Sequence, residues 1–287
     1  MSLWGILAIN SFAFGGLLFL LSAGFSLIFG LMRVPNLTHG SMFMLGGYVG
    51  ASLYQTWHLP FWLAALGAAA AMAAFGGLIE RLLLRRLSGS ILAQVLVTLG
   101  ISFIVADFCL LVWTGDPISV TTPKSLAGGV RAFGLFFTFY RMAIILVACV
   151  VAALLWALLD KTRLGAMIRA GVDDPQMARV VGIRVSRLFT TVFCLGAALA
   201  GFGGIMGAPV LTVYPGLDTD MLPLALLIVI LGGAGSLLGS LIGSFLIGFL
   251  YNFGQAMFPE LAYFVLFLPM VLVLALRPQG LFGRSAS

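Results

Sequence analysis

The chain has 287 residues, of which 62% are hydrophobic and only 8% are charged, and its mean hydropathy is +1.16. A soluble globular domain carries about 25% charged residues, so this composition excludes a soluble protein and indicates a polytopic membrane protein. The formal net charge is +6, but the basic residues stand in loops between apolar runs rather than along one soluble face, which argues against nucleic-acid binding.

The N-terminal segment and the cysteines exclude further classes. No charged residue precedes Arg33, whereas a secretory signal peptide has a basic segment ahead of its apolar core, so no cleaved signal peptide is expected. Three cysteines at wide spacing, Cys109, Cys149 and Cys194, predict neither a disulfide framework nor a metal site.

Apolar runs long enough to cross about 30 Å of hydrocarbon recur along the chain. They predict about nine membrane helices, near residues 8–31, 40–56, 61–80, 92–113, 141–159, 189–208, 221–235, 237–255 and 260–276. The second and seventh runs are short and rich in glycine, so a broken or re-entrant segment is an alternative for each. The predicted fold class is an all-α polytopic bundle of about nine transmembrane or re-entrant helices.

The polar segment 33–41 opens the second run and contains Asn36, Thr38, His39, Gly40 and Ser41. One interpretation is an ordinary loop in which Asn36 or Thr38 caps the next helix. The other is that these groups face a polar pathway, because paired glycine-interrupted segments such as 40–56 and 221–243 often mark the centre of a transporter.

Small residues recur at helical spacing in several predicted spans and favour close helix packing in lipid. The stripes are Gly46 and Gly50; Gly196, Ala200, Gly204 and Ala208; and Gly235, Gly239 and Gly243. The residues predicted to pack helices are Gly46, Gly50, Gly232, Gly233, Gly235, Gly239 and Gly243.

Asp107 lies within the fourth apolar run, where a carboxylate costs roughly 2.5–3.5 kcal/mol at the bilayer centre unless it is paired or wet. A polar partner on another helix is therefore expected. No chain of intramembrane carboxylates accompanies Asp107, which argues against a proton- or sodium-driven carrier.

The longest polar stretch, loop 160–188, contains a short helix with signals at both ends. Asp174 is a good N-cap, Pro175 fits the first helical position and Gly182 suits the left-handed residue that ends a helix. Met177, Val180 and Val181 share one face of this helix. So short a helix is unstable alone, so it either folds back on its own protein or docks into a groove on a partner.

The basic residues predict orientation, because cytoplasmic loops carry an excess of Lys and Arg. Most of them lie in loop 81–90, loop 160–188 and the C-terminal tail: Arg81, Arg85, Arg86, Lys161, Arg163, Arg169, Arg179, Arg184, Arg187, Arg277 and Arg284. Loop 114–140 carries Lys124 and Arg131. The first three segments are predicted to be cytoplasmic and the N-terminus to lie on the far side, although one re-entrant segment would reverse the N-terminal side.

The sequence lacks the motifs for ATP binding and for serine hydrolysis. The chain has no Walker A phosphate-binding loop, so an ATP-driven role needs a separate ATPase. The sequence His39-Gly40-Ser41 alone does not make a serine hydrolase, because no nucleophile turn with an oxyanion hole accompanies it.

Four segments resemble the LivH-like permease subunits of branched-chain amino acid ABC transporters. They are 34–49 (VPNLTHGSMFMLGGYV), 162–183 (TRLGAMIRAGVDDPQMARVVGI), 230–243 (ILGGAGSLLGSLIG) and 276–283 (LRPQGLFG). The resemblance covers nearly the whole length, so residues 1–287 are expected to form a single permease domain.

The resemblance implies an inner-membrane permease that pairs with a LivM-like permease, two cytoplasmic ATPase subunits and a periplasmic binding protein. ATP and magnesium would bind to the ATPase subunits, and this chain would hold no cofactor and catalyse no reaction itself. Segment 170–182 resembles the coupling helix that sits in the ATPase groove, with candidate residues Gly171, Asp173, Asp174, Pro175, Met177, Ala178, Arg179, Val180, Val181 and Gly182.

The expected cargo is a branched-chain or related amino acid, and the candidate pathway residues are Asn36, Thr38, His39, Gly40 and Ser41. Because related permeases serve urea and short amides, such cargo is an alternative. A gradient-driven carrier or channel is a second alternative, and a structural scaffold, which would not need a capped loop helix, is a third.

Overall fold

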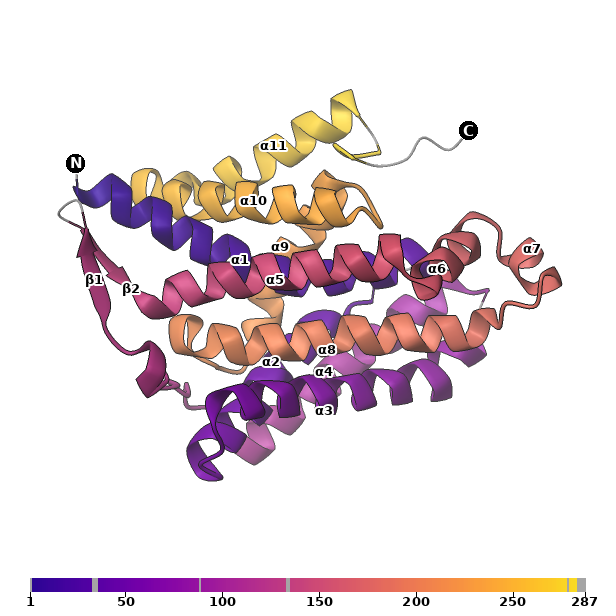
Figure 1. The fold of residues 1–287 in the computed structure, drawn as a ribbon, viewed down its shortest axis with the longest axis horizontal. Helices are drawn as coiled ribbons and strands as arrows, with labels where there is room; N and C mark the ends of the chain where they lie inside the picture. Colours follow the sequence, from indigo (N-terminus) through magenta and orange to yellow (C-terminus); the bar gives the residue numbers. More distant parts are fainter. Residues whose placement is uncertain (1, 33–35, 88, 133–134, 278, 283–287) are drawn as a thin grey trace.

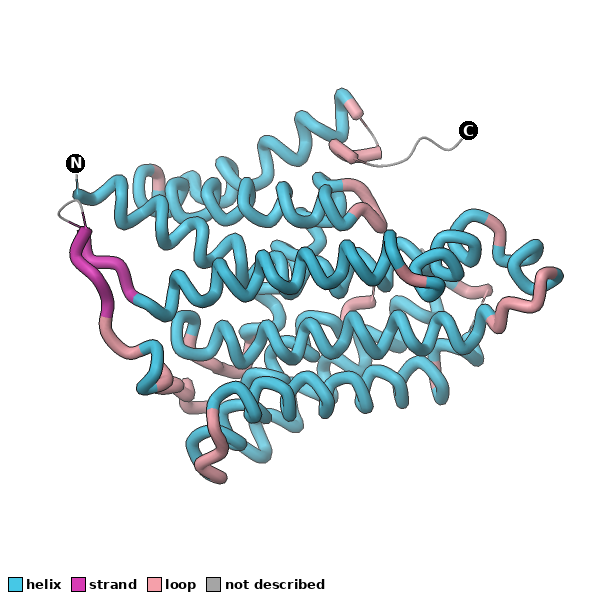
Figure 2. The backbone as a smooth tube through the Cα atoms, viewed as in Figure 1, coloured by secondary structure: helices cyan, strands magenta, loops and turns pink. Residues whose placement is uncertain are grey.

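The computed structural model describes residues 2–32, 36–87, 89–132, 135–277 and 279–282. Two parts of the sequence predictions lie outside the described residues: Arg33 and Pro35 of the polar segment 33–41, and Arg284, which entered the predicted orientation. Nearly all of the described chain is helical (Figure 2).

Seven helices in the described part of the chain are long and apolar enough to cross a membrane. They are α1 (Ser2–Met32), α3 (Phe61–Leu82), α4 (Ile91–Trp113), α5 (Phe139–Lys161), α8 (Val185–Leu211), α10 (Leu237–Met257) and α11 (Ala262–Leu276), the last extended by a 3₁₀ turn at Pro259–Leu261. These positions agree with seven of the predicted spans, and the all-α polytopic fold class is confirmed.

The other two predicted spans are shorter helices in the interior of the bundle (Figure 1). Helix α2 (Thr38–Ala51) has 14 residues and α9 (Leu217–Gly232) has 16. At 1.5 Å per residue they measure about 21 and 24 Å, less than the roughly 30 Å of hydrocarbon. A π-helical turn at Ser52–Thr56 extends α2. Of the roughly nine predicted transmembrane or re-entrant helices, seven are therefore long helices and two are short ones in the described part of the chain.

Helix α2 is the most enclosed element, because it packs against α3, α4, α8 and α9. Every described residue in it except Val49 is buried. A helix that is apolar or small on all sides is expected at the core of a bundle, and this explains why the composition of 38–51 shows no polar face.

Loop 114–140 contains a small β-hairpin that the sequence did not predict. Strands β1 (Gly129–Ala132) and β2 (Leu135–Thr138) pair antiparallel with Gly129 opposite Thr138. A 3₁₀ turn at Lys124–Leu126 precedes them, and the hairpin lies at the same end of the bundle as the start of α1 (Figure 1).

The opposite end of the bundle collects the segments predicted to be cytoplasmic. Helices α6 (Arg163–Asp173) and α7 (Pro175–Val180) project there, and a 3₁₀ turn at Leu84–Leu87 follows α3 beside the start of α8 (Figure 1). The described part of the tail lies there too, because the backbone N–H of Leu281 donates to the carbonyl of Leu231 at the end of α9. The fold thus brings the basic loops to one end of the molecule.

Glycine residues allow close contact between α2 and α8. A Cβ atom on Gly46 would lie 2.8 Å from the carbonyl oxygen of Gly201, and one on Gly204 would overlap the Phe43 carbonyl. A Cβ on Gly50 would lie 2.6 Å from the side chain of Ile205. The predicted stripe of Gly46 and Gly50 therefore packs closely on α8, whereas the predicted stripe on α8 is shared, with Gly204 against α2 and Gly196 against Gly24 of α1.

The third stripe differs from its prediction at one end. Gly239 lies on α10 against Gly232, and Gly243 lies against Ile228 of α9. Gly233 and Gly235, however, have φ of +95° and +77° and form the turn between α9 and α10. Both positions favour glycine, because positive φ strains any residue with a Cβ atom. Gly235 also packs as predicted, since a Cβ atom on it would lie 3.1 Å from Gly30 of α1.

Candidate functional site

Helix α7 has the capping geometry that the sequence predicts. The Asp174 side chain accepts hydrogen bonds from the backbone N–H groups of Gln176 and Met177, both at 2.9 Å. At the other end Gly182 has φ +87°, and the N–H of Ile183 donates to the Ala178 carbonyl at 2.9 Å. These bonds satisfy backbone groups that the end of a helix leaves unpaired, so the predicted short helix is confirmed.

The apolar face of α7 points away from its own protein. Met177 is 58% exposed, Val180 81% and Val181 68%, whereas Ala178 on the other side is buried. Of the two alternatives for this helix, packing back onto its own chain is therefore wrong for these three side chains. Asp173, Asp174 and Arg179 are also exposed around the same helix.

Helix α6 holds α7 in place, and the sequence reasoning missed it. Its first turn is capped by Thr162, whose hydroxyl accepts from the N–H of Gly165 at 3.3 Å. Ile168 is buried in a cluster with residues of α1, α5 and α8, and Leu164 and Val172 pack against that cluster. The apolar spacing of Leu164, Ile168 and Val172 was visible in the sequence, but the surrounding charges led to its interpretation as a loop.

An open cavity of about 390 Å³ lies at the base of α7. Its lining combines apolar side chains, among them Leu164, Met167, Val181 and Ile183, with the basic residues Arg184 and Arg187. A surface of this kind suits a partner that presents an apolar side chain next to an acidic one.

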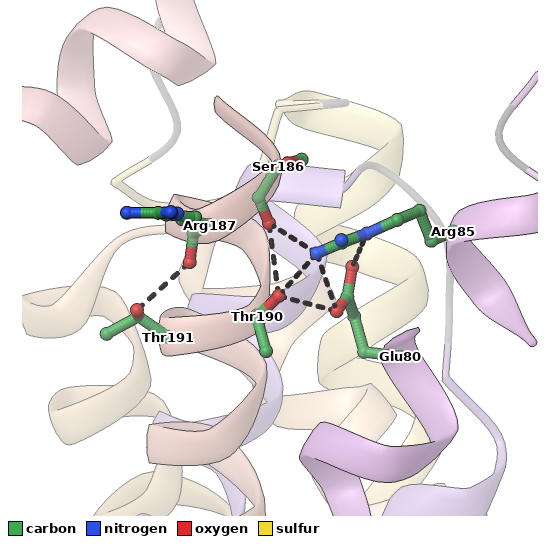
Figure 3. A network of polar contacts seen from close by, with 6 residues as sticks. All are labelled: Glu80, Arg85, Ser186, Arg187, Thr190 and Thr191. Carbon is green, nitrogen blue, oxygen red and sulfur yellow. Dashed lines mark hydrogen bonds and ion pairs between the residues drawn. The ribbon is translucent and has the colours of Figure 1, made fainter. Parts of the chain in front are cut away.

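A buried ion-pair network lies next to this cavity and links α3 to α8 (Figure 3). Glu80, which is only 1% exposed, accepts a hydrogen bond from the Thr190 hydroxyl at 2.6 Å and pairs with Arg85 Nη2 at 3.4 Å. Arg85 also donates to the Ser186 carbonyl at 3.0 Å and to Thr190 Oγ1 at 2.7 Å. Ser186 and Thr190 belong to the first turns of α8, so the network connects the segment after α7 to a second long helix.

The predicted pathway residues are brought together at the start of α2, where they are buried. The Asn36 side chain accepts from the N–H of Thr38 at 3.2 Å, but the N-cap position is Leu37 and α2 has no side-chain cap, so Asn36 is not the helix cap considered for it. Thr38 does not cap the helix; its hydroxyl donates to the Thr98 carbonyl of α4 at 2.8 Å. His39 Nε2 lies 3.0 Å from the Leu21 carbonyl of α1.

Gly40 and Ser41 face α9. A Cβ atom on Gly40 would lie 2.8 Å from the Asp218 carbonyl oxygen, and the Ser41 hydroxyl donates to the Asp218 carboxylate at 2.9 Å. Sequence reasoning assigned no role to Asp218, because nothing local distinguishes it from an N-terminal helix carboxylate.

Buried polar atoms without a hydrogen-bond partner gather around α2. Among the described residues they are Ser26 Oγ, Asn36 Nδ2, His39 Nδ1, Tyr48 OH, Gln94 Oε1 and Asp218 Oδ1. Buried polar groups are almost always paired in folded proteins, so each of these exceptions is typical of a position that receives a ligand or water.

The chain matches the family described as "Branched-chain amino acid transport system / permease component" over residues 7–274. The chain belongs to this family. The resemblance found in the sequence is confirmed, and the predicted membrane-spanning permease is confirmed with it.

Individual relatives of this permease align over nearly its whole length. The high-affinity branched-chain amino acid transport system permease protein BraD of Pseudomonas aeruginosa is 27% identical over 96% of this chain and 94% of its own. Its counterpart LivH of Escherichia coli is 26% identical over the same shares. LivM of Escherichia coli is 30% identical over 91% of this chain and 67% of its own. No solved structure matches the chain.

The first turn of α9 carries a second carboxylate, Asp220, which is paired with Tyr214 of the connection between α8 and α9. The Tyr214 hydroxyl donates to the Asp220 side chain. Burial and, after it, the hydrogen bond to Asp220 raise the pKa of Tyr214 to about 12, so this tyrosine keeps its proton at neutral pH. Backbone bonds between Ile118 and Val213 hold the same connection against loop 114–140.

Asp107 of the permease does not have the helix partner expected for it. Its side chain is exposed on α4, and it makes no hydrogen bond or ion pair with the described residues. The expectation assumed that every face of α4 is covered by this chain, whereas most of α4 is exposed in the isolated subunit.

Proposed function

We propose that this chain is the LivH-type permease subunit of an ATP-driven importer that carries branched-chain or related amino acids across the inner membrane. A LivM-like permease pairs with it, two cytoplasmic ATPase subunits bind ATP and magnesium, and a periplasmic binding protein delivers the cargo. Three findings support this assignment: the family, the similarity to both LivH and LivM, and the lack of a Walker A loop in the sequence.

The observation that carries the coupling part of the proposal is the exposed apolar face of α7. A helix with both ends capped that presents Met177, Val180 and Val181 to water is the geometry of a docking element. The cavity beside it, with Arg184 and Arg187, supplies the charge that an acidic rim on the ATPase would meet. On this proposal loops 81–90 and 160–188 and the C-terminus are cytoplasmic, which agrees with the basic residues gathered at that end.

The proposed mechanism has no covalent chemistry in this chain. ATP binding closes the ATPase pair, α7 moves with its groove, and α5 and α8 tilt because they are joined to the two ends of the α6–α7 segment. The Glu80–Arg85–Thr190 network passes the movement of α8 to α3. Alternating access then follows from the different affinities of ATP and of loaded binding protein for the two states. Asn36, Thr38, His39, Gly40 and Ser41 line the proposed pathway.

The test is reconstitution of all four kinds of subunit in proteoliposomes, with uptake of leucine and of urea measured with and without ATP. Val181→Asp is expected to reduce leucine uptake at least tenfold while the complex still hydrolyses ATP, because a carboxylate in an apolar groove is strongly disfavoured. Val181→Leu keeps the face apolar and is the matched control.

Two results would contradict the proposal. ATP-independent uptake at the full rate by this chain alone would indicate a carrier or channel, and normal uptake by Val181→Asp would exclude α7 as the docking element. Uptake of urea but not of leucine would replace the proposed cargo with the amide alternative.

A further inference from the structure

Asp218 lies deep inside the bundle, in the first turn of α9. It is 7% exposed, and its Oδ2 accepts the Ser41 hydroxyl at 2.9 Å. Thr38, which begins α2, is bonded to Thr98, seven residues into α4, and so lies roughly 10 Å from the start of that helix. Ser41 follows one turn later, which puts it and Asp218 near the middle of a membrane about 30 Å thick.

The other carboxylate oxygen has no partner. Asp218 Oδ1 is buried without a hydrogen bond to any described residue, and neither described ion pair involves Asp218. Cys109 of α4 is close enough to interact with Asp218, and a thiol is a weak hydrogen-bond donor. A carboxylate in a membrane interior is costly to bury unless a cation or further donors complete it.

The described surroundings offer the carboxylate a helix dipole and one hydroxyl donor but no ion pair. Asp218 is in the first turn of α9, where the helix dipole presents a partial positive charge to an anion. The Ser41 hydroxyl adds one donor. What remains is an acceptor oxygen that forms no ion pair with any cationic side chain of the described residues.

The complement to this oxygen is a small cation that carries N–H donors. A metal ion would need several more oxygen ligands, and the described residues hold no group of three His, Cys, Asp or Glu side chains that could supply them. A primary ammonium needs one carboxylate and a few neutral acceptors, and Asp218 Oδ1 supplies the carboxylate oxygen.

We infer that Asp218, oriented by Ser41, binds the ammonium group of an amino acid while the cargo crosses the membrane. The inference rests on the proposed function and makes it more specific, because urea and short amides carry no cation. The contact of Gly40 with the Asp218 backbone and with Leu222 keeps α2 and α9 in register, so the hydroxyl stays on the carboxylate.

The first test is leucine uptake by the reconstituted four-subunit transporter with Asp218→Asn, which keeps the size and an acceptor for Ser41 but removes the charge. Uptake is expected to fall at least tenfold. Asp220→Asn, two residues along the same helix, changes a carboxylate that is exposed and bonded to Tyr214, and it is expected to stay within twofold of the unmodified protein.

The second test needs no variant. An apolar carbodiimide should modify Asp218 in the purified complex, and leucine should slow this modification severalfold more than 2-hydroxy-4-methylpentanoate, which has a hydroxyl in place of the ammonium. Equal protection by the two compounds, or near-normal uptake by Asp218→Asn, overturns the inference while leaving the importer assignment intact. No leucine uptake by the unmodified complex overturns the proposed function and the inference together.

Discussion

The sharpest stability prediction concerns Thr190, whose hydroxyl completes the buried network between α3 and α8. Its Oγ1 donates to Glu80 Oε2 at 2.6 Å, and the carboxylate is only 1% exposed. Thr190→Val removes this donor while the side chain keeps nearly the same shape. Glu80 then retains only Arg85, at 3.4 Å, whose side chain is 40% exposed.

The magnitude follows from the charge and burial of the acceptor. A hydrogen bond to a charged group contributes about 1.5–3 kcal/mol, and leaving a buried acceptor without its donor has a cost of similar size. Arg85 can move closer to Glu80 and recover part of this loss, but its exposed side chain is partly screened by solvent. We therefore expect Thr190→Val to lower the free energy of unfolding by about 2 kcal/mol.

The assay is unfolding of the purified permease in mixed micelles with a rising fraction of denaturing detergent. Thr191→Val is the matched control, since the Thr191 hydroxyl is exposed and donates only to the Arg187 carbonyl of its own helix (Figure 3). The control is expected to change stability by less than about 0.5 kcal/mol. Equal effects of the two substitutions would refute the network as a link between α3 and α8.

Three further predictions use the same preparations. Gly204→Ala should destabilise the protein by about 1–3 kcal/mol or more, because the added Cβ atom overlaps the Phe43 carbonyl. Gly100→Ala, where the added Cβ atom meets open space, should not destabilise the protein, and similar values for the two variants would refute the close α2–α8 contact. Asp174→Ala should weaken α7 by about 0.5–2 kcal/mol, which hydrogen exchange of the first-turn amides would detect, and should lower ATP-driven uptake. His39→Ala should lower the transport rate without lowering the protein level; unchanged uptake kinetics would assign His39 a purely structural bond to α1.

Features set by neighbouring residues were predictable from the sequence. The ends of α7 depend on Asp174 and Gly182, which act within one turn of the chain, and both behave as expected. Seven long spans follow from apolar runs alone. Helix α6 was predictable in principle from Leu164, Ile168 and Val172, but its charged residues concealed an apolar stripe only three residues long.

Features that join distant segments were not predictable. Ser41 and Asp218 are 177 residues apart and Glu80 and Thr190 are 110 apart, and one sequence contains no signal for either pairing. Each residue alone has an ordinary local interpretation: Asp218 as a helix N-terminal carboxylate and Glu80 as the charged end of a span. Only the packing of α2 against α9 and of α3 against α8 shows that these polar groups are buried together.

The packing of α8 connects the proposed docking element to the proposed pathway. Helix α8 begins five residues after α7 ends, and farther along the same helix Gly204 touches the backbone of Phe43 on α2. Backbone contacts of this kind have no flexible side chain to absorb a displacement, so α2 must follow a tilt of α8 or the two helices must separate. Following that tilt would shift Ser41 relative to α9 and change the distance from its hydroxyl to Asp218. On this reasoning the nucleotide state of the ATPase subunits changes the distance between the Ser41 hydroxyl and the Asp218 carboxylate that we assign to the ammonium group. The affinity of Asp218 for cargo should therefore differ between the ATP-bound and the nucleotide-free transporter.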